Sequence, residues 1–567
     1  MNSEAVLTLA KRRGFLWPSS EIYGGIAGFY DYGPLGSTMK RAIEDVWRRY
    51  YVMGEGFAEI SSTDITAEEV FIASGHVNEF RDFLIQCEKC GEVYRADHLV
   101  KDYSDEAEAL SAEQLDELVV KENIRCQRCK GGLSSPRPFN LMFELEIGAG
   151  PKGGRKGYLR PETAQGIFVN FGLLYRFFRE KMPFGVVQVG RGYRNEISPR
   201  QGVIRLRELN MAEAEVFVKP GEDGWVRYEE MKDVKMKLVP QSGETIDVTL
   251  GEAIEKGIIK KKILGYFMAV TQKFLLDVGV DPDKLRFRQH LADEMAHYAA
   301  DCWDAEAELS LGWIEIVGVA DRTCYDLEGH ISHSKEDLRA FERFEEPVEV
   351  EERKVIVDPK VLGPKFKKDA GKVKAALEAM DPNKIEGKET VTVEVDGQTF
   401  EVEKEAFEIQ LVKEKKSGER YVPSVIEPSY GIDRIFYTVL EHSYNEGEEN
   451  YITLQLKPEI APVKVGVFPL MGKNELIVKA KPIDDMLRNA GIMTYYDDSG
   501  SIGRRYARMD EIGTPFCITI DYESLEDNAV TIRDRDTTDQ ARVGIDRLLE
   551  IFNGLLNNVL SFKEIGK

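Results

Sequence analysis

Hydrophobic residues follow two different periods along this chain, and the first is helical. In the segment from 34 to 53 the apolar residues at helical spacing are Met39, Ile43, Val46, Trp47 and Tyr50. A Gly/Pro turn precedes this segment and two glycines follow it. The pattern predicts a long amphipathic helix over residues 34 to 53.

From residue 461 onward, runs of strand length alternate with stretches of helical period. We expect strands at 463–470, 492–498, 516–521 and 529–536, and helices at 476–491, 504–513 and 539–560. Regular alternation of strands with helices predicts a separate α/β domain, with a largely parallel sheet, over 461–567.

Two charged segments interrupt the apolar pattern before that domain. Residues 331–420 are strongly charged and broken by turn residues, and this composition predicts an inserted, mostly β module. A similar charged insertion covers 219–262. The remaining stretches, 1–218, 263–330 and 421–460, are therefore expected to form one interrupted domain.

The stretch GRGYRNEISPRQGVIRLREL, residues 190–209, gathers five arginines among apolar residues. It predicts an antiparallel hairpin whose second strand, 203–209, places Arg205 and Arg207 on one face. Guanidinium groups bind phosphate or carboxylate in two-point geometry, so these arginines are candidates for a pocket wall. The alternative is an exposed ladder of salt bridges.

Composition and charge narrow the class of protein. A length of 567 residues predicts three or four domains, and 43% hydrophobic with 31% charged residues is typical of a water-soluble globular protein with no membrane span. A net charge of −23 repels polyanions at long range, so any RNA contact must be local. The N-terminus places apolar residues before basic ones, the reverse of a secretory signal, and we expect a cytoplasmic protein with no membrane partner.

Four of the seven cysteines form two CxxC pairs, Cys87 with Cys90 and Cys126 with Cys129. Two such pairs supply the four thiolates of a tetrahedral Zn²⁺ site. The long gap between the pairs costs little closure entropy. We expect a structural zinc knuckle over 87–129, and free or redox-active thiols are the alternative.

Five blocks of sequence carry a resemblance to a known family. In order they are RPETAQG (160–166), YRNEISPRQG (193–202), MAEAE (211–215), GWIEIVGVADRTCYDL (312–327) and EPSYGIDR (427–434). They are similar to the motifs of class II aminoacyl-tRNA synthetases, and within that class to the dimeric glycyl-tRNA synthetases of archaeal and eukaryotic type. The resemblance implies an α+β catalytic domain, built as an antiparallel sheet flanked by helices, and a C-terminal α/β anticodon-binding domain. It also implies ATP-dependent attachment of glycine to tRNA(Gly) through a glycyl-adenylate.

The resemblance implies an ATP site that takes ATP with Mg²⁺. Arg194 would contact the α-phosphate and the amino-acid carboxylate, Arg434 the γ-phosphate and adenine, and Glu196 would help to hold ATP. These three are the expected catalytic residues, and Glu315 is the carboxylate expected near Mg²⁺. The set expected to bind ATP is Arg194, Asn195, Glu196, Ile204, Arg205, Leu206, Arg207, Glu208, Leu209, Glu315, Ile316, Gly431, Ile432, Asp433 and Arg434. Leu209 stands where many class II enzymes have phenylalanine, and Asp433 where some have glycine.

The implied glycine pocket holds an ammonium group with carboxylates. Glu162 and Glu213 would take this role beside Ser429, while bulk around the substrate Cα excludes larger amino acids. An ion pair with Arg160 is the alternative role for Glu162. The set expected around glycine is Arg95, Glu162, Leu209, Asn210, Met211, Ala212, Glu213, Glu427, Pro428, Ser429, Tyr430 and Gly431.

Resemblance also implies the macromolecular partners. The C-terminal domain is similar to the anticodon-binding domain shared by glycyl, histidyl, prolyl and threonyl enzymes, which places Arg504, Arg505 and Arg508 at tRNA bases. By composition alone, the arginines of such a helix would lie on its solvent-exposed face. The helix at 34–53 resembles the motif 1 dimer element and predicts a homodimer, with packing in its own core as the alternative.

Two other functions fit parts of the sequence. A class II synthetase for another small amino acid would share the ATP motifs, but Glu162, Glu213 and Ser429 argue against it. A noncatalytic RNA-binding relative would characteristically lack a motif 2 or motif 3 arginine, and Arg194 and Arg434 are both present.

Overall fold

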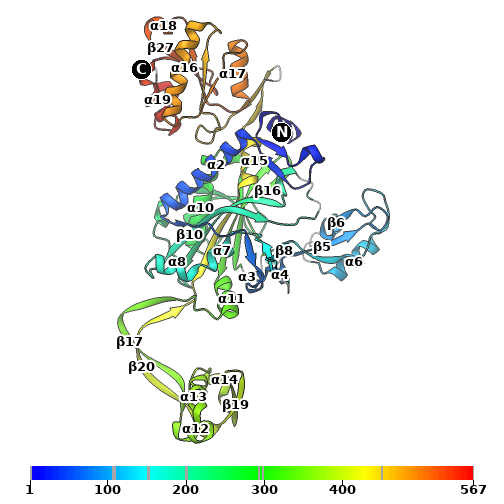
Figure 1. Ribbon diagram of the computed structural model, residues 1–567, viewed down its shortest axis with the longest axis vertical. Helices are drawn as coiled ribbons and strands as arrows, with labels where there is room; N and C mark the ends of the chain where they lie inside the picture. Colours follow the sequence, from blue (N-terminus) through cyan, green and yellow to red (C-terminus); the bar gives the residue numbers. More distant parts are fainter. Residues whose placement is uncertain are drawn as a thin grey trace. The chain divides into compact units, whose positions relative to one another are not determined.

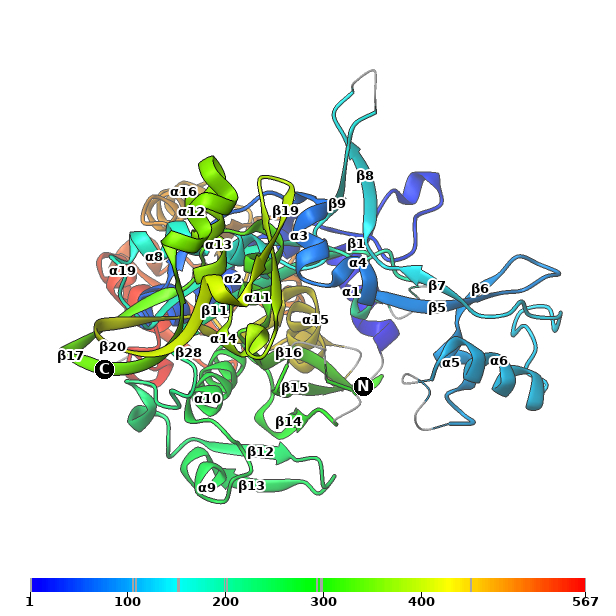
Figure 2. The same ribbon diagram turned by 90° about the horizontal axis from the view of Figure 1, so that it is seen from below.

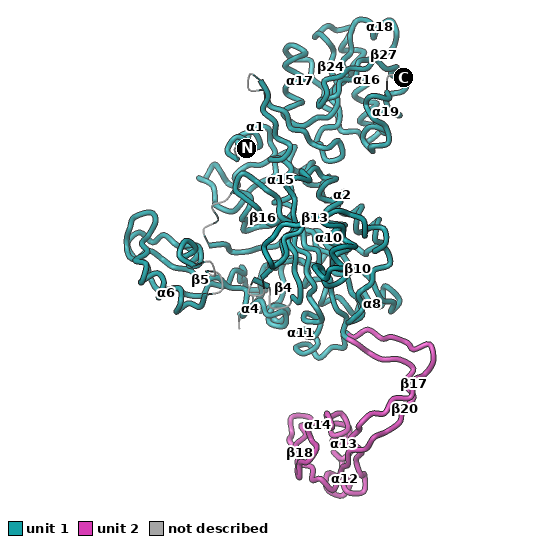
Figure 3. Tube along the Cα trace, turned by 180° about the vertical axis from the view of Figure 1, so that it is seen from behind, with its two compact units in different colours: residues 1–338, 422–567 teal, residues 339–421 magenta. Residues whose placement is uncertain are grey.

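The chain divides into two units in a computed structural model (Figure 3). One unit comprises residues 1–338 and 422–567, and the other comprises Arg339–Tyr421. Described residues are 3–104, 107, 110–149, 153–197, 199, 202–291, 294–295, 299–448 and 451–565. Ser198, Arg200 and Gln201 of the arginine stretch lie outside them.

A nine-stranded sheet forms the centre of the first unit (Figure 1). Neighbouring strands run antiparallel, except that β12 pairs parallel with β14 and β10 pairs parallel with β3. The strand order is β13 (Ile246–Thr249), β12 (Lys235–Val239), β14 (Leu285–Gln289), β15 (Asp301–Leu309), β16 (Gly312–Thr323), β21 (Ser424–Gly431), β11 (Glu208–Val218), β10 (Phe184–Tyr193) and β3 (Ala58–Glu59).

Three helices cover one face of this sheet and form the main core with it. They are α2 (Pro34–Arg48), α10 (Lys262–Asp277) and α15 (Ile432–Ser443). Helix α2 continues as a π-helical turn, Arg49–Gly54, which confirms the predicted helix. Met39, Ile43 and Trp47 are all 0% exposed within this chain. The apolar stripe therefore packs in its own core, and it is no argument for a subunit interface.

The charged segment 219–262, expected as an insertion, extends the main sheet. Its strands β12 and β13 pair with each other and, through β14, continue the sheet at its edge. Helix α9 (Leu250–Glu255) follows, with Thr249 and Glu252 forming a capping box at its start. Charged residues predominate here because an edge strand keeps much of its surface in water.

A small lobe surrounds the two CxxC pairs (Figure 2). It contains a three-stranded sheet and two helices: β5 (Arg81–Gln86), β6 (Val93–Arg95), β7 (Arg137–Asn140), α5 (Ala96–Val100) and α6 (Ala112–Lys121). A second three-stranded sheet consists of β4 (Ile65–Ala67), β9 (Arg155–Leu159) and β8 (Phe143–Ile147). Other short helices of the first unit are α3 (Glu68–Ala73), α4 (His76–Glu79), α7 (Ala164–Phe168), α8 (Phe171–Phe177) and α11 (Tyr325–Ser334).

The C-terminal domain has its own core, as expected. It differs from the prediction in the direction of two strands and in the start of the last helix. Strands β25 (Thr494–Tyr496), β24 (Val465–Pro469) and β26 (Phe516–Ile520) are parallel, whereas β27 (Ala529–Asp534) and β28 (Gln540–Gly544) are antiparallel. The helices are α16 (Asn474–Asn489), α17 (Ile502–Asp510), α18 (Ser524–Asp527) and α19 (Leu548–Leu556). The prediction of one closing helix from 539 was wrong, because 540–544 pairs with the edge of β27 and the helix begins only at Leu548.

The second unit is built on a long antiparallel ribbon, β17 (Ala340–Val357) with β20 (Phe407–Tyr421). Beyond the ribbon lie α12 (Pro359–Phe366), α13 (Ala370–Glu378), α14 (Pro382–Ile385) and the hairpin β18 (Thr390–Val395) with β19 (Gln398–Glu403). The predicted start at 331 falls inside α11 of the first unit. The module is thus smaller and more helical than the sequence pattern indicated.

None of the helices in the described part of the chain is both long and apolar enough to span a membrane.

Candidate active site

The face of the main sheet opposite α2, α10 and α15 carries the polar residues of the site. Along β11 the even positions Ala212 and Val216 belong to the main core. The odd positions Glu213 and Glu215 point to the opposite face, as the period of two in a strand requires. Strand pairing then sets Glu213 beside Ser429 of β21, and Ser429 beside Gly318 of β16. Residues far apart in sequence therefore line one surface.

A hollow in this face gathers most of the residues expected at ATP. Its lining is Arg194, Glu196, Val203, Ile204, Arg205, Leu206, Leu209, Asn210, Met211, Glu315, Ile316, Ser429, Gly431, Asp433 and Arg434. Three separate segments supply it: the hairpin β10–β11, the strand β16, and the end of β21 with the start of α15. Four members of the predicted ATP set, Asn195, Arg207, Glu208 and Ile432, do not line the hollow.

The hairpin forms as predicted, but its second strand begins later. Strands β10 and β11 pair antiparallel from Phe184↔Phe217 to Tyr193↔Glu208. Gly202–Ile204 is a 3-10 turn entered at a positive φ of 59° at Gly202, and β11 begins at Glu208. The prediction of a strand from 203 was wrong, because Gly202 starts a turn and pairing with β10 begins only at Glu208.

The arginines of the hairpin make different contacts. Arg207 donates to the backbone oxygens of Glu196 (2.9 Å) and Ala27 (2.9 Å), so it braces the turn. Arg194 is half-buried and lies over the ring of Phe80, with its guanidinium carbon 5.5 Å from the ring centre. Arg205 approaches Glu196 at 3.9 Å. Of these, Arg194 and Arg205 line the hollow.

Arg434 and Glu315 face each other at the mouth of the hollow. Arg434 Nη1 donates to the Glu315 carboxylate at 3.0 Å and to its backbone oxygen at 2.8 Å. Partial burial opposes the charge of Glu315, but Arg434 and the more distant Arg194 outweigh it and lower the pKa of this carboxyl. Glu315 is therefore charged at neutral pH and half exposed, as a carboxylate that meets a hard cation must be.

Beside Ser429, Glu213 is held in one orientation by four hydrogen bonds. One carboxylate oxygen accepts from the backbone N–H of Thr163 (2.7 Å), the Thr163 hydroxyl (2.5 Å) and the backbone N–H of Ala164 (2.9 Å). The other oxygen accepts from the Ser429 hydroxyl at 2.7 Å. These bonds hold the carboxylate in one fixed position beside Ser429.

Sequence reasoning did not find the cation at the centre of this pocket. Arg322 is 1% exposed and donates two bonds to Asp326 (2.8 and 2.9 Å) and two to Glu427 (both 2.9 Å). It also lies 3.5 Å from Glu162. The block 312–327 contains Arg322 and Asp326, but nothing local in that pattern distinguishes them from a surface pair.

Glu162 lies beside His76 and Arg322, and Arg160 is not its partner in the described part of the chain. It accepts from Gln165 at 3.0 Å and adjoins His76 at 3.5 Å. Arg160 instead pairs with Asp64 at 2.8 Å. Burial would raise the pKa of Glu162, but His76 and Arg322 outweigh that effect and lower it. The alternative role for Glu162 is therefore wrong.

Several residues predicted around glycine turn elsewhere. Ala212 and Tyr430 are 0% exposed and pack in the main core, where the Tyr430 hydroxyl lies 2.7 Å from that of Tyr51. Pro428 pairs with Val319, a residue of the same core. Arg95 binds Asp97 (2.7 Å) and Asp82 (3.1 Å) in the small lobe. The side chains of Ala212, Tyr430 and Pro428 therefore lie on the core side of the sheet, away from Glu213.

The structure shows the contacts of Asp433 and Leu209, the two residues that differ from the family pattern. Asp433 is buried and accepts from the Asn210 backbone N–H (2.6 Å), the Asn210 side chain (2.8 Å) and the Tyr32 hydroxyl. It thereby fixes the strand end that carries Leu209. Leu209 is half-buried and lines the hollow as a plain apolar surface.

The four cysteines come together in the small lobe. All four sulfurs lie within 4.8 Å of one another, with Cys87 to Cys129 at 3.5 Å and Cys90 to Cys126 at 3.6 Å. Tetrahedral Zn–S bonds of about 2.3 Å place sulfurs roughly 3.8 Å apart. The spacing fits a four-thiolate ion site that has no open position.

Comparison with known proteins agrees with this geometry. Residues 144–443 match the family described as "tRNA synthetase class II core domain (G, H, P, S and T)", and residues 464–555 match "Anticodon binding domain". The chain is 53% identical to the glycine–tRNA ligase of Methanothrix thermoacetophila, covering 99% of this chain and 98% of that protein. It is 52% identical to the glycine–tRNA ligase of Archaeoglobus fulgidus (100% and 99% covered) and 50% identical to that of Methanocaldococcus jannaschii (96% and 98% covered).

This chain belongs to the glycine–tRNA ligases of class II. Class II synthetases in general use ATP with Mg²⁺, and the hollow between Arg194 and Arg434 is where this member carries the matching motifs.

The anticodon-binding domain of this ligase uses most of its predicted RNA-binding arginines internally. Arg505 is 1% exposed and donates to the backbone oxygens of Asp497 (3.2 Å) and Leu470 (3.2 Å). Arg508 pairs with Asp497 at 3.0 Å. Arg504 is exposed. The expectation that Arg505 meets RNA bases was wrong, because this side chain is enclosed by the carbonyl groups that it satisfies.

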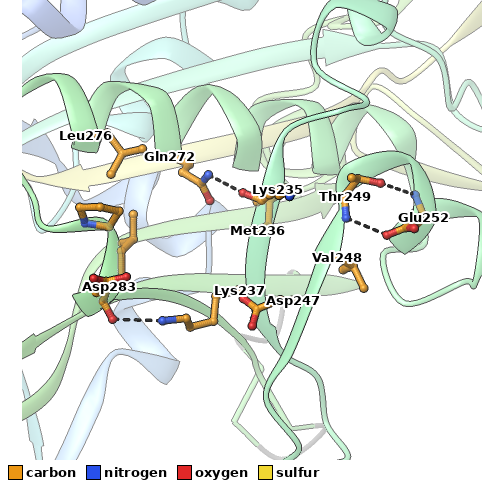
Figure 4. Close-up of a pocket in the computed structure, with 12 residues that line it drawn as sticks. Lys235, Met236, Lys237, Asp247, Val248, Thr249, Glu252, Gln272, Leu276 and Asp283 are labelled. Atoms are coloured by element: carbon orange, nitrogen blue, oxygen red, sulfur yellow. Dashed lines mark hydrogen bonds between the residues drawn. The ribbon is translucent and has the colours of Figure 1, made fainter.

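A second hollow in the ligase lies away from the motifs (Figure 4). It has a volume of about 450 Å³ and lies between β12, β13 and α10. Its polar groups bind one another: Gln272 donates to the Lys235 backbone oxygen (2.7 Å), and Lys237 donates to that of Asp283 (3.0 Å). Its lining mixes polar residues, such as Lys235 and Asp247, with apolar ones, such as Met236 and Leu276.

Proposed function

We propose that this chain attaches glycine to tRNA(Gly) at the hollow described above, in two steps. The observation that carries the proposal is the adjacency of a fixed carboxylate pocket, around Glu213, to an arginine hollow that ends at Ser429. A carboxylate pocket recognises an ammonium group, and arginines recognise phosphates. Glycine and ATP are the pair of substrates that fits both.

In the first step, a glycine carboxylate oxygen attacks the α-phosphorus of ATP and pyrophosphate leaves. Arg194 stabilises the charge that gathers on the α-phosphate, and Arg434 holds the γ-phosphate. Glu315 is the residue that would hold Mg²⁺, which neutralises phosphate charge when bound. In the second step, a hydroxyl of the terminal tRNA ribose attacks the glycyl carbonyl and AMP leaves.

Selection of glycine follows from what the pocket holds. Glu213, Glu162 and Ser429 fix the ammonium group, while Arg322 and its carboxylate partners fill the space behind it. A larger amino acid would have to displace this buried ion network, and this steric and electrostatic barrier discriminates more strongly than loss of a contact.

The assignment is tested by ATP–pyrophosphate exchange without tRNA, against all twenty amino acids, with Arg194→Ala as the control. We expect exchange with glycine alone and a loss of at least about 100-fold in the variant. Exchange with serine or alanine would mean that the pocket is misassigned. No exchange with any amino acid would favour a noncatalytic RNA-binding role.

We further propose that the small lobe binds one structural Zn²⁺ through Cys87, Cys90, Cys126 and Cys129. The sulfur spacing supports this ion, and a closed four-thiolate site supports a role in folding the lobe. Metal analysis of the purified protein tests it, and about one zinc per chain is expected.

We also propose that the ligase works as a homodimer in the cytoplasm. The support from this structure is an exposed apolar segment before α2, where Ile22 is 89%, Tyr23 87% and Ile26 56% exposed. Exposed apolar groups of this size favour a protein contact. Light scattering after size exclusion distinguishes a dimer from a monomer, and Tyr23→Asp with Ile22→Asp should shift a dimer toward monomer.

A further inference from the structure

The sheet of the small lobe, β6–β5–β7 (Figure 2), has an apolar contact on each of its two faces. Side chains alternate along β5, so Leu84 and Ile85 point to opposite faces. Ile85 and its pairing partner Tyr94 belong to the buried cluster around the cysteines. Leu84 belongs to a different buried cluster, which it forms with Leu141 and Ile197. The second face of the lobe sheet therefore packs against something other than the cysteine core.

Ile197 comes from the segment that joins β10 to β11, residues 194–207, which we call the arginine loop. All three members of its cluster are between 5% and 7% exposed. Strand pairing places Val93 and Phe139 on the same face of the lobe sheet as Leu84, and both pack against this cluster. The lobe thus provides the apolar surface that buries Ile197.

Two further contacts join the arginine loop to the ends of the lobe sheet. The backbone N–H of Asn195 donates to the carbonyl oxygen of Leu141, the residue after β7, at 2.6 Å. The Arg194 guanidinium lies over the ring of Phe80, the residue before β5. Arg194 and Glu196 line the hollow, and the residue that follows each of them contacts the lobe. One side of this short stretch is therefore held while the other faces the hollow.

The returning part of the arginine loop approaches the lobe through Arg205. Its Nη1 lies 3.4 Å from Nε2 of His98, a residue of α5. Arginine N–H groups only donate, so the His98 nitrogen accepts and its ring is neutral. Burial favours the same state, because it lowers the pKa of His98 to about 4. Arg194 and Arg205, which both line the hollow, thus have supports on the lobe side.

We propose that the small lobe is the platform that positions the arginine loop for ATP, and that Leu84 and Ile197 are positioning residues for adenylate formation. This inference rests on the proposed ATP site. Neither of these two side chains lines the hollow, so both act through Arg194, Glu196 and Arg205. A displacement of about 1 Å in groups that orient reacting atoms can cost about 100-fold in rate. Loss of the apolar anchor should therefore appear in the kinetics of ATP.

The test is ATP–pyrophosphate exchange with glycine on Leu84→Ala, on Ile197→Ala and on the double variant of the full chain. Each single change should lower kcat/KM for ATP about tenfold, because the loop loses its anchor. If both side chains act through one contact, the double variant should lose about 10- to 20-fold, whereas independent effects would multiply to roughly 100-fold.

Glycine provides an internal comparison in the same assays. Its expected ammonium site at Glu213 is held by Thr163, Ala164 and Ser429, and none of these belongs to the arginine loop or the lobe. KM for glycine should therefore change by no more than about threefold in the single variants. A general loss of folded protein would lower kcat and leave both KM values unchanged.

Val120→Ala and Ile197→Leu are the matched controls. Val120 lies on α6 of the same lobe and is 73% exposed, so its truncation should leave kcat/KM for ATP within about twofold of wild type. Ile197→Leu keeps the apolar volume and should retain at least about half of the wild-type kcat/KM. A loss in Val120→Ala equal to that in Ile197→Ala would contradict the proposal, because Val120 lies outside the contact. Thermal unfolding shows whether each variant is folded.

The wild-type protein provides a test that needs no variant and decides the question if Ile197→Ala does not fold. Coupling between two sites is reciprocal, so ATP bound at the arginine loop must also stabilise the contact with the lobe. Hydrogen–deuterium exchange with and without ATP should therefore slow about fivefold in the peptides that carry Asn195, β5 and β7.

Three further results would overturn the inference. One is a folded Ile197→Ala protein with the wild-type kcat/KM for ATP. Another is a double variant whose loss equals the product of the two single losses. The third is ATP that slows deuterium exchange at Asn195 but leaves β5 and β7 unchanged. The wild-type protein still exchanges pyrophosphate with glycine in all three cases, so they leave the proposed function intact, whereas a wild-type protein without exchange would contradict that function first.

Discussion

Individual side chains in this ligase hold charge where water cannot reach it, and Arg322 is the clearest instance. It donates four hydrogen bonds to Asp326 and Glu427, and all three side chains are buried. Arg322→Met should lower the free energy of unfolding by about 3–5 kcal/mol, because it leaves buried carboxylates without a cation. Denaturant unfolding measures the loss.

The matched control for that change is Arg41→Met on the exposed face of α2. A surface arginine contributes little, so its effect should stay within about 0.5 kcal/mol. If Arg41→Met and Arg322→Met lowered the free energy of unfolding equally, the buried ion network would contribute no more than a surface arginine.

Leu209 offers a second test at the same scale. It lines the hollow with Ile316 and Arg434 and stands where many class II enzymes have an aromatic ring. Leu209→Phe should lower KM for ATP by roughly 2- to 10-fold, because aromatic stacking contributes about 0.5–1.5 kcal/mol beyond area burial. KM for glycine should not change. A higher KM for ATP would mean that the ring has no room beside adenine.

Secondary-structure elements differ in how far the sequence predicts them. The helix at 34–54 and the hairpin β10–β11 follow from local periodicity and were predicted. The segment 203–207 was not, because its alternation resembles a strand while Gly202 starts a turn. Local periodicity does not predict that Glu162 and Glu427 meet Arg322. Strand pairing sets Glu427 beside Ala320, two residues before Arg322, and Glu162 comes from the segment that precedes α7.

The small lobe gives a prediction at the scale of an element. Cys126→Ser should abolish zinc binding and destabilise the lobe, because Cys87 and Cys126 are themselves part of its small buried core. Metal analysis and limited proteolysis measure both effects. Cys324→Ser is the control: this thiol donates to the Val422 backbone oxygen at 3.3 Å, a bond that a hydroxyl also makes. Zinc retained by Cys126→Ser, or lost in both variants, would contradict the assignment.

At the scale of the whole molecule, the candidate active site lies in one of the two units. Every residue of the hollow and of the carboxylate pocket belongs to the first unit. The second unit has its own core, in which Val373, Leu377 and Val402 are 0% exposed. Its charged sequence predicted a separate module, whereas its helices were not foreseen, because turn residues and charges hid their short apolar faces.

Removal of the second unit is therefore expected to leave adenylate formation intact. Ala340 pairs with Tyr421 at the base of the ribbon, so the chain leaves and returns at neighbouring positions, and a short Gly-Ser linker can join Leu338 to Val422. ATP–pyrophosphate exchange with glycine should stay within about threefold of the full chain, because no catalytic or core residue of the first unit is lost. Transfer of glycine to tRNA(Gly) is then measured on the same deletion protein. If transfer falls while exchange stays normal, the second unit acts in the tRNA step. Loss of exchange in a folded deletion protein would instead show that the module supports the active site.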